Sequence, residues 1–508
     1  MFHLMGINKI VLIHPPYFRL YNNTFSFNRY PLSLGYLAGT IKAKSKWDVT
    51  AYNADFAPQT TIGNDHVTFS YQTSKGYANY LANLNNPQAP IWAEVAAAIR
   101  ELNPAVVGIS AMSQNFRSAR VVAKIVKEIN GDTIVVVGGP HPSMVGAELL
   151  NCQDIDIGVM GEGERTIIEL LDAIETGKSL DQIKGLVFRK NGMPVANPRR
   201  EFIKDLDTLC FPHETAEEVL KDFGLYPKSA FGTIFSARGC PYACTFCGSY
   251  RIWSRAPRLR SPQNIIEEIT NLQKMGIKSL RFTDDTFGLN AKWIEELCNG
   301  IIQQCPDLNW KCEMNINLIN DKLLSLLKSA GCHMIEVGIE SGDDTILKVM
   351  KKNITTEQAL EACRLINKHR IELQTYFILG FPQETEESLQ KTRELIKKIN
   401  GYIWISIFSP FPGTEIYQSC RDAGTISETY DISLHNFQSL DSFCTNIPPK
   451  RFKEIATTII REVDKKNGRN RIKRIFSVNT LWRIKELGIR QAIRKGLRII
   501  LSRVIFNK

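Results

Sequence analysis

The sequence lacks several features that would place it in common classes of protein. No apolar run reaches the roughly 18 residues that cross a bilayer, and residues 1–13 contain neither a basic stretch nor a small-residue cleavage site. No G-x-G-x-x-G or Walker motif is present either. We therefore expect a cytoplasmic protein rather than one that spans a membrane or is secreted.

Positive charge is unevenly spread along the 508 residues, which are 44% hydrophobic and sufficient for two or three domains. The net charge of +11 suggests nucleic acid until it is mapped. From Lys465 onwards, fourteen Lys and Arg face one acid, Glu486, so this segment carries +13 and the rest of the chain −2. Because no recognition motif is present, we expect no nucleic-acid partner.

Residues 1–200 alternate β-rich runs with helical patterns, which predicts a parallel sheet with crossover helices. Strands are expected at residues 9–13, 47–52, 105–110, 134–138 and 155–160, and helices at 32–42, 91–102, 117–129 and 166–176. The stretch 55–90, rich in Asn, Gln, Thr and Tyr, is expected to be a long loop or irregular insertion. A hairpin around Asn191-Gly192 follows.

A second βα series begins after an irregular segment at residues 205–228. Its strands are expected at 233–237, 279–283, 310–315, 334–338, 373–379 and 402–408. The best marked helix covers 262–275, with Ser261 as N-cap, Pro262 in the first turn and Gly276 at its end. Six βα units predict an incomplete barrel.

Three of the twelve cysteines, Cys240, Cys244 and Cys247, lie together directly after the first strand of this series. Three thiolates on one loop can hold three irons of a 4Fe-4S cluster and leave the fourth iron open. A structural zinc site is the alternative, but it needs a fourth ligand, and no second C-x-x-C or H-x-x-x-H pair completes the set. The other nine cysteines are expected to be core residues.

The C-x-x-x-C-x-aromatic-C loop resembles that of the radical S-adenosylmethionine (radical SAM) superfamily. The resemblance implies that the open iron chelates S-adenosylmethionine and that one electron cleaves it to a 5′-deoxyadenosyl radical. It also implies that Phe246 helps pack the adenine.

Later motifs follow in the order that this family predicts, at the carboxyl ends of strands, where barrel active sites are built. By resemblance, the S-adenosylmethionine contacts come from Phe282–Phe287, Gly338–Gly342, 378–385 and 408–414, namely Asp284, Asp285, Glu340, Ser341, Ile378, Gly380, Glu384 and Pro410. A solvated acidic turn is the alternative for the two aspartates, and helix N-capping is the alternative for Ser341.

The first half resembles the cobalamin-binding domain that precedes the radical domain in one subgroup. Glycines at strand ends let backbone amides approach a large cofactor. The positions implied for cobalamin are Pro15, Pro16, Leu32, Gly35, Ser110, Gly138, Gly139, Pro140, His141, Gly161, Glu162 and Gly163. The D-x-H-x-x-G motif that supplies histidine to cobalt elsewhere is absent, so no lower axial ligand is named, although His141 is a candidate.

The resemblance implies an α/β enzyme of defined parts. These are a Rossmann-like cobalamin-binding domain (1–200), a linker (201–228), a partial (β/α)6 TIM-type radical SAM barrel (229–445) and a C-terminal helical region with a basic amphipathic helix (446–508). Its cofactors are a 4Fe-4S cluster, S-adenosylmethionine and cobalamin.

The expected reaction is methylation of an unactivated carbon through methylcobalamin. Oxidative cyclisation or rearrangement on the same scaffold is the alternative. A cobalamin sensor without catalysis fits less well because a sensor needs no cysteine triplet. An RNA methylthiotransferase fits less well because the cysteine-rich N-terminal domain of those enzymes is missing. By position alone, Cys312, Glu313 and Tyr376 are candidates to quench an intermediate.

Residues 481–506 place apolar side chains at helical spacing with Arg and Lys between them. Such a helix could bind the inner face of a membrane or pack on the barrel with its charges in solvent, and both alternatives stay open. The expected partners are a small-molecule, lipid or glycan substrate and a reductant such as flavodoxin or ferredoxin.

Overall fold

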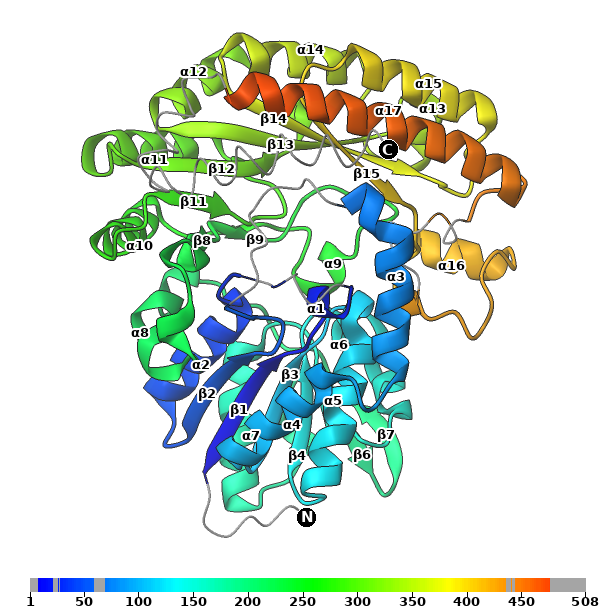
Figure 1. Ribbon diagram of the computed structural model, residues 1–508. Helices are drawn as coiled ribbons and strands as arrows, with labels where there is room; N and C mark the ends of the chain where they lie inside the picture. Colours follow the sequence, from blue (N-terminus) through cyan, green and yellow to red (C-terminus); the bar gives the residue numbers. More distant parts are fainter. Residues whose placement is uncertain are drawn as a thin grey trace.

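Two sheets, one above the other, organise the chain (Figure 1). The computed structural model describes residues 8–21, 26, 28–58, 69–434, 440 and 444–475. The first sheet has the order β2-β1-β3-β4-β5-β6-β7, and the second has the order β15-β14-β13-β12-β11-β8. The predicted α/β architecture, with a parallel sheet followed by a partial barrel, is confirmed.

The first sheet is parallel over five strands and ends in an antiparallel hairpin. Its strands are β1 (Lys9–His14), β2 (Asp48–Asn53), β3 (Val106–Ser110), β4 (Ile134–Gly138), β5 (Ile157–Val159), β6 (Leu186–Lys190) and β7 (Met193–Ala196). Val and Ile runs build the parallel strands because helices bury both faces. Asn191 and Gly192, both at positive φ, turn the predicted hairpin.

Helices cover the two faces of this sheet separately. The helices α2 (Leu32–Lys44) and α7 (Gly163–Thr176) pack on one face with Ile10 and Leu12. On the other face, α4 (Pro90–Leu102) and α5 (Phe116–Ile129) pack with Val11 and Ile13. Alternate side chains of β1 therefore belong to the hydrophobic cores on the two faces of the sheet.

Two segments expected to be irregular contain helices. Residues 69–85 form α3 (Phe69–Asn85), and Tyr80 and Leu84, four residues apart, bury one face of it against the first domain. The polar composition of the segment concealed this helical spacing. Residues 212–219 form α8 (Pro212–Val219), which packs on α2 because Gly35 leaves room for Pro212.

The second sheet is parallel throughout and curves into a partial barrel. Its strands are β8 (Thr233–Ile234), β11 (Ser279–Phe282), β12 (Asn309–Met314), β13 (Cys332–Glu340), β14 (Glu372–Leu379) and β15 (Tyr402–Ile407). The outer helices are α10 (Pro262–Lys274), α11 (Ala291–Gln304), α12 (Asp321–Ser329), α14 (Thr356–Lys368) and α15 (Glu386–Lys398). As predicted, Ser261 caps α10, accepting from the Asn264 amide at 3.2 Å.

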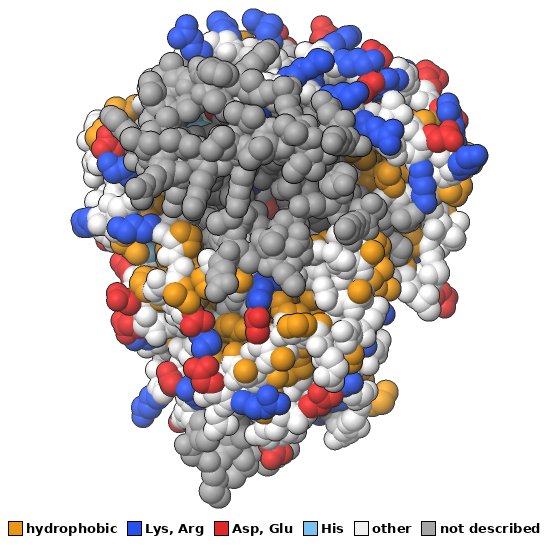
Figure 2. Space-filling model, viewed as in Figure 1, with side chains coloured by type: hydrophobic (Ala, Val, Ile, Leu, Met, Phe, Trp, Pro, Cys, Tyr) orange, Lys and Arg blue, Asp and Glu red, His pale blue; other side chains and the backbone are white. Residues whose placement is uncertain are grey.

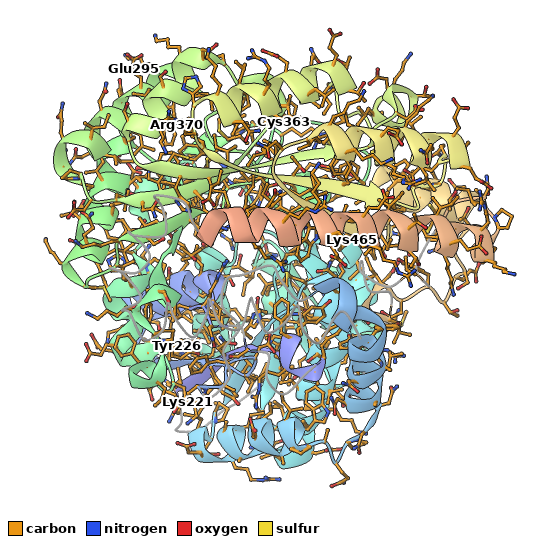
Figure 3. All side chains as sticks on the ribbon, turned by 45° about the horizontal axis from the view of Figure 1, so that its top comes forward. Lys221, Tyr226, Glu295, Cys363, Arg370 and Lys465 are labelled. Atoms are coloured by element: carbon orange, nitrogen blue, oxygen red, sulfur yellow. The ribbon has the colours of Figure 1, made fainter. Side chains whose placement is uncertain are left out.

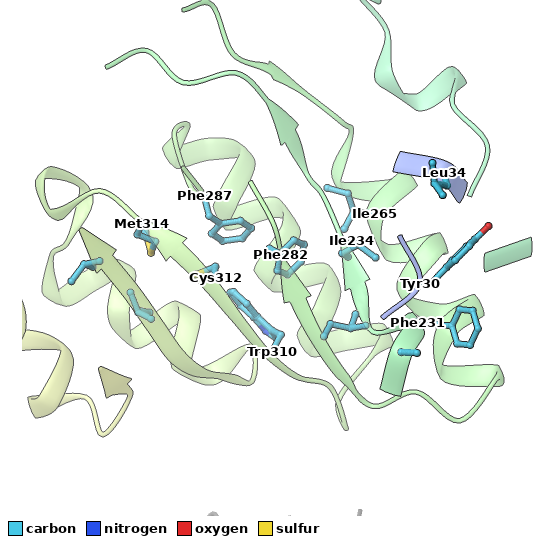
Figure 4. Close-up of a cluster of buried hydrophobic side chains, with 14 of the residues drawn as sticks. Tyr30, Leu34, Phe231, Ile234, Ile265, Phe282, Phe287, Trp310, Cys312 and Met314 are labelled. Carbon is cyan, nitrogen blue, oxygen red and sulfur yellow. The ribbon is translucent and has the colours of Figure 1, made fainter. Parts of the chain in front are cut away.

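Alternate side chains of each barrel strand have opposite surroundings. On the outer face, Phe282, Trp310 and Met314 are buried in the core between sheet and helices (Figure 4). Polar side chains occupy the intervening positions and are partly exposed, among them Arg281 and Lys311, which are paired in register. The inner face of the barrel is therefore a polar wall.

The chain ends its described part in α16 (Glu415–Asp422) and the long helix α17 (Pro449–Ile475). Figure 3 shows α17, with Lys465 labelled, lying along the sheet. Asn467 bonds both the amide (3.0 Å) and the carbonyl (2.8 Å) of Ile403, so its side chain occupies the free edge of β15. The basic helix predicted at residues 481–506 lies outside the described residues.

Charges on the helices around the barrel are mixed in sign. In Figure 2, Lys and Arg side chains alternate with Asp and Glu at the upper right of the molecule. Ion pairs such as Arg451–Glu386 at 2.8 Å join α17 to α15. Among the described residues, no helix is at once long and apolar enough to cross a membrane.

Candidate active site between the two sheets

The cysteine loop is closed by its own short hairpin. The strand expected at 233–237 is shorter than predicted: after β8 the chain turns, and β9 (Ala237–Arg238) pairs antiparallel with β10 (Arg258–Leu259). Gly239 has φ of +102° and lies so close to the Ser254 carbonyl oxygen that a Cβ would be 2.8 Å from it. A glycine is required here, directly before Cys240.

Both domains hold the cysteine loop. The Thr245 amide donates to the carbonyl oxygen of Met350 at 3.0 Å. On the other side, Gly248 abuts Met144 of α6 (Pro140–Val145), where a Cβ would lie 2.2 Å from the Met144 Cε. Arg199 donates to the carbonyls of both Arg251 (2.6 Å) and Ser143 (2.5 Å). The loop is thus fixed against the first domain.

The three cysteines of the loop are half-buried, whereas all others except Cys210 are buried. Burial raises the pKa of the Cys244 thiol, and the Lys352 ammonium opposes this shift. Cys240 Sγ lies 3.4 Å from the Thr286 hydroxyl. Among the described residues, no three His, Cys, Asp or Glu side chains are grouped as they would be around a single metal ion.

The two aspartates after β11 have different surroundings. The Asp284 carboxylate is buried and accepts from the amides of Ser236 (2.6 Å) and Ala237 (3.1 Å), which fixes the turn between β8 and β9. Burial raises its pKa to about 6. Asp285 is exposed and accepts from the Ser249 hydroxyl at 2.6 Å. Asp285 is therefore the one of the pair that remains accessible, while Asp284 shapes the base of the cysteine loop.

Glu340 ends β13 in a strained conformation, with φ of +75°. Its carboxylate is paired with the Lys352 ammonium at 2.8 Å, and both side chains are largely buried. Gly338 makes room for the pair, because a Cβ there would be 2.2 Å from Glu340 Oε1 and 2.8 Å from Lys352 Nζ. Sequence reasoning named Glu340 but missed Lys352.

Ser341 is fully buried and does not cap the next helix. Its hydroxyl accepts from the Asp343 amide at 3.2 Å. The N-cap of α13 (Asp344–Val349) is Asp343, which accepts from the amides of Thr345 and Ile346. The capping alternative for Ser341 is therefore wrong, and the residue instead fixes the turn after Glu340.

The motif after β14 is a buried turn held by Glu384. One carboxylate oxygen accepts from the amides of Gly380 (2.5 Å) and Phe381 (3.1 Å), and the other, Oε1, is buried and has no hydrogen-bond partner among the described residues. Burial raises the pKa of Glu384 to about 8. Phe246 and Ile378 pack together against the apolar cluster beside this turn. Pro410, in the loop after β15, is buried as well.

The carboxyl ends of the first domain's strands converge below the cysteine loop (Figure 1). Ser110 ends β3 and Gly138 ends β4, and Pro15 and Pro16 follow β1. Gly139 has φ of +106°, and a Cβ there would lie 2.9 Å from the Ala111 carbonyl oxygen. Gly161, also at positive φ, borders open space. Pro140 begins α6.

Several residues assigned to cobalamin by resemblance make contacts within the protein. His141 is buried, stacks on Phe116 at 3.9 Å between ring centroids, and holds Ser113 Oγ at 3.0 Å through Nδ1. Burial lowers its pKa to about 4. Gly35 contacts Pro212, and Gly163 contacts Leu37. Leu32 packs against the cluster of Tyr36, Ile203, Leu206 and Phe235.

Glu162 joins the two domains through buried ion pairs. Its carboxylate contacts Arg238 at 2.7 Å and Arg258 at 2.9 Å, and Arg238 also contacts Glu164 at 2.6 Å. The Arg238 guanidinium lies 5.0 Å from the Trp253 ring centroid. The Gly161–Glu164 motif therefore ties the first sheet to the hairpin that carries the cysteines.

The inner wall of the barrel holds a charged group that sequence reasoning missed. Glu336 is buried and accepts from Arg281 (2.6 Å), Lys311 (2.8 Å) and the Tyr376 hydroxyl (3.0 Å). Tyr376 therefore faces this wall. Cys312 does not: it is buried on the outer face beside Trp310 (Figure 4), so its candidacy as a quenching group is wrong.

Comparison with known families assigns both halves. The radical SAM superfamily model matches residues 234–396, and the B12 binding domain model matches residues 19–171. The chain is 31% identical over 82% of its length to an uncharacterised methyltransferase of Pyrococcus horikoshii, 83% of which is covered. The chain therefore belongs to the cobalamin-dependent radical SAM enzymes.

Two further relatives, a cyclase and a methyltransferase, are named for different reactions. The anaerobic magnesium-protoporphyrin IX monomethyl ester cyclase of Rubrivivax gelatinosus is 27% identical over 84% of this chain and 72% of that protein. The radical SAM methyltransferase TsrM of Kitasatospora setae, solved with cobalamin and a [4Fe-4S] cluster, shares the fold with a TM-score of 0.63. That match has 17% identity and covers 82% of this chain and 75% of TsrM. The cofactors of this enzyme are cobalamin, a 4Fe-4S cluster and S-adenosylmethionine, and the sensor alternative is excluded.

Proposed function

We propose that the enzyme methylates an unactivated carbon of a small molecule held between the barrel and the first domain. The observation that carries this proposal is the direct contact of the cysteine loop with the carboxyl edge of the first sheet, through Gly248 and Met144. A radical formed at the cysteine loop and a methyl group carried at the edge of the first sheet would then both be next to the same substrate.

Within that scheme, Cys240, Cys244 and Cys247 hold the cluster. They fit it because they are half-buried and share one loop, whereas a closed zinc site needs a fourth ligand, which the motif does not supply. When bound, the cluster and S-adenosylmethionine supply hydrogen abstraction, and cobalamin supplies the methyl group. The protein supplies position and the exclusion of water.

The S-adenosylmethionine site is proposed to use Asp285, Glu340, Phe246, Ile378 and the turn at Gly380. The Glu340–Lys352 pair, lodged over Gly338, offers a fixed carboxylate beside the cysteine loop. Asp284, Ser341, Glu384 and Pro410 are buried, so we assign them to positioning these groups.

The cobalamin site is proposed to lie over Pro15, Pro16, Ser110, Gly138, Gly139 and Gly161. Gly161 borders open space, which a corrin could occupy. His141 fits an axial ligand poorly, because Ser113 and Phe116 already hold its ring. The domain limits at 200, 228 and 445 stay predictions.

Reconstitution tests the proposal. Anaerobic loading with iron, sulfide and hydroxocobalamin should give roughly four irons per chain, and dithionite with S-adenosylmethionine should release 5′-deoxyadenosine. C240A, C244A and C247A should each lose both, while C210A, which removes a half-buried thiol elsewhere, should keep both. Full iron content in C244A would refute the ligand assignment.

Oxidative cyclisation is the second candidate, favoured by the similarity to the Rubrivivax gelatinosus cyclase over 84% of this chain. With deuterated methyl S-adenosylmethionine, methylation places the label in the product and cyclisation does not. A flavodoxin or ferredoxin is proposed as reductant. The proposed membrane contact, and the lipid or glycan substrates that it favours, rest on residues 481–506. Co-sedimentation of the protein with anionic liposomes, with and without these residues, tests the membrane contact. Equal sedimentation of the two forms contradicts it.

A further inference from the structure

Three exposed arginines lie beside the cysteine loop. Arg251 belongs to the short helix α9 (Ser249–Ile252), which begins two residues after Cys247, and Arg255 follows that helix. Arg199 comes from the segment after β7 and donates to the Arg251 carbonyl at 2.6 Å, so the two segments are in contact. We call these three arginines the arginine patch.

Tyr250 holds two members of the arginine patch in place. The guanidinium carbons of Arg255 and Arg251 lie 4.8 and 5.3 Å from the centroid of its ring, the distance of a cation–π contact. The ring is itself anchored, because the Tyr250 hydroxyl donates to the Gly413 carbonyl at 3.1 Å. Arg251 Nε donates to the same oxygen at 3.0 Å. The patch is therefore ordered before a partner binds, which lowers the entropy cost of forming an interface.

The charge of the patch is not balanced within the part of the chain that the structure describes. There, none of its three arginines forms an ion pair. Three other arginines around the cysteine loop, Arg200, Arg238 and Arg258, each pair with a glutamate. The patch thus differs from its surroundings in the lack of a carboxylate partner.

The nearest evidence of a carboxylate at α9 is Asp285, which accepts from the Ser249 hydroxyl and not from an arginine. Burial, with the charge of Arg251, lowers the pKa of Arg199. Like charges held side by side repel one another, and a partner of opposite charge removes that repulsion. The patch is therefore suited to an acidic partner.

The position of the patch indicates what such a partner would do. The Ser249 amide donates to Cys247 Sγ at 3.5 Å, so α9 starts at a residue that is proposed to hold the cluster. The enzyme needs an electron from another molecule, and a carrier docked on α9 would be next to that cysteine. Electron-transfer complexes use small interfaces that charge complementarity brings together.

We propose that the arginine patch is the docking surface for the electron donor of this enzyme, a small carrier protein with an acidic surface around its cofactor. In the docked complex the carrier is oxidised by one electron and the cluster accepts that electron, with no atom transferred. This inference rests on the proposed function, because it takes Cys240, Cys244 and Cys247 as the cluster ligands.

Calorimetric titration of the reconstituted enzyme with two acidic carriers, an oxidised flavodoxin and an oxidised ferredoxin, tests the docking. R255E is the first variant because, among the described residues, Arg255 contacts only the Tyr250 ring through its side chain. We expect R255Q to weaken binding about 2- to 5-fold and R255E about 10-fold at low ionic strength. Salt at 0.5 M (roughly a 4 Å Debye length) should remove most of both effects. R370E is the matched control, at an exposed arginine before β14 and thus at the far end of the barrel, and should bind as the wild type does.

The rate of cluster reduction gives a second readout. With the reduced carrier it should fall in R255E as binding falls. With reduced methyl viologen, a small cation that needs no acidic docking surface, it should be no slower than in the wild type. Iron content is measured in each variant, so that damage to the cysteine loop is not mistaken for lost docking.

The outcomes separate the docking surface from the proposed function. If neither carrier binds the wild type, if R255E binds as tightly, or if R370E weakens binding as much, the docking surface is refuted. If R255E keeps the carrier and loses cobalamin, the patch binds an anionic part of that cofactor instead, which also overturns the inference. Release of 5′-deoxyadenosine with methyl viologen tests the proposed function separately, because that reductant does not use the patch.

Discussion

The ion pair between Arg238 and Glu164 should contribute far more to stability than an exposed pair at the same distance. The chain offers such a comparison, because Arg364 and Glu361 on α14 are also 2.6 Å apart. The side chains of the first pair are 7% and 8% exposed, and those of the second are 61% and 51% exposed. The two pairs therefore match in distance and differ in burial, although the exposed pair has a second bond, from Arg364 Nε to Glu361 at 2.7 Å.

Breaking the buried pair leaves an uncompensated charge, which costs about 3–5 kcal/mol. In R238M, Glu164 loses its ion pair with Arg238, whereas Glu162 keeps its ion pair with Arg258. The double variant R238M/E164Q removes both charges and should recover part of the loss, giving a coupling energy of about 2–3 kcal/mol. For R364M/E361Q we expect a much smaller coupling energy, because water and salt screen an exposed pair.

Urea unfolding of each single and double variant, followed by circular dichroism, gives the two coupling energies. Iron content is measured beside it, because Arg238 lies two residues before the first cysteine of the loop. A coupling below about 1 kcal/mol at Arg238 would refute the reasoning, since the pair would then behave like an exposed one.

Three further changes have calculable directions. Burial raises the pKa of Glu384 to about 8 from an ordinary value of 4.5, so the unfolded chain loses a proton that the folded chain keeps and stability falls as pH rises from about 5 to 8. The melting temperature of E384Q should therefore increase relative to that of the wild type as the pH rises through this range. A difference in melting temperature that does not change with pH would contradict the raised pKa. G342A should destabilise by about 1–3 kcal/mol in urea, because its Cβ would lie 2.4 Å from the Thr392 Cα; an unchanged midpoint would show that α15 moves freely. G468A, in α17 with nothing within 4 Å of its Cβ, should stabilise by about 0.5–1 kcal/mol in the same assay, and a loss of stability would mean that the helix needs this glycine.

The sequence allowed the two-sheet architecture to be predicted because local patterns determine it. Runs of Val and Ile mark strands buried on both faces, and Ser261 and Gly276 mark the ends of a helix through their capping chemistry. The helix at residues 69–85 was missed because Asn, Gln, Ser and Thr lie among the few side chains that it buries, Tyr80 and Leu84 with Tyr77 and Leu81 beside them.

The candidate site was predictable only where a motif is contiguous. The cysteine loop was found in this way. The ion pair between Glu162 and Arg238 could not be predicted, because the two residues are 76 positions apart and no local pattern connects them. Arg281, Lys311 and Glu336 lie on three separate strands, so only the fold brings them together.

The bonds from Asn467 to Ile403 give the helix α17 a role beyond packing. An open barrel ends in a strand whose amide and carbonyl groups would otherwise accept a strand from another molecule. The Asn467 side chain bonds the amide and the carbonyl of Ile403 as a neighbouring strand would, but it presents no further backbone groups for pairing. The helix thereby covers part of an edge that would otherwise be open to pairing with a strand of another chain.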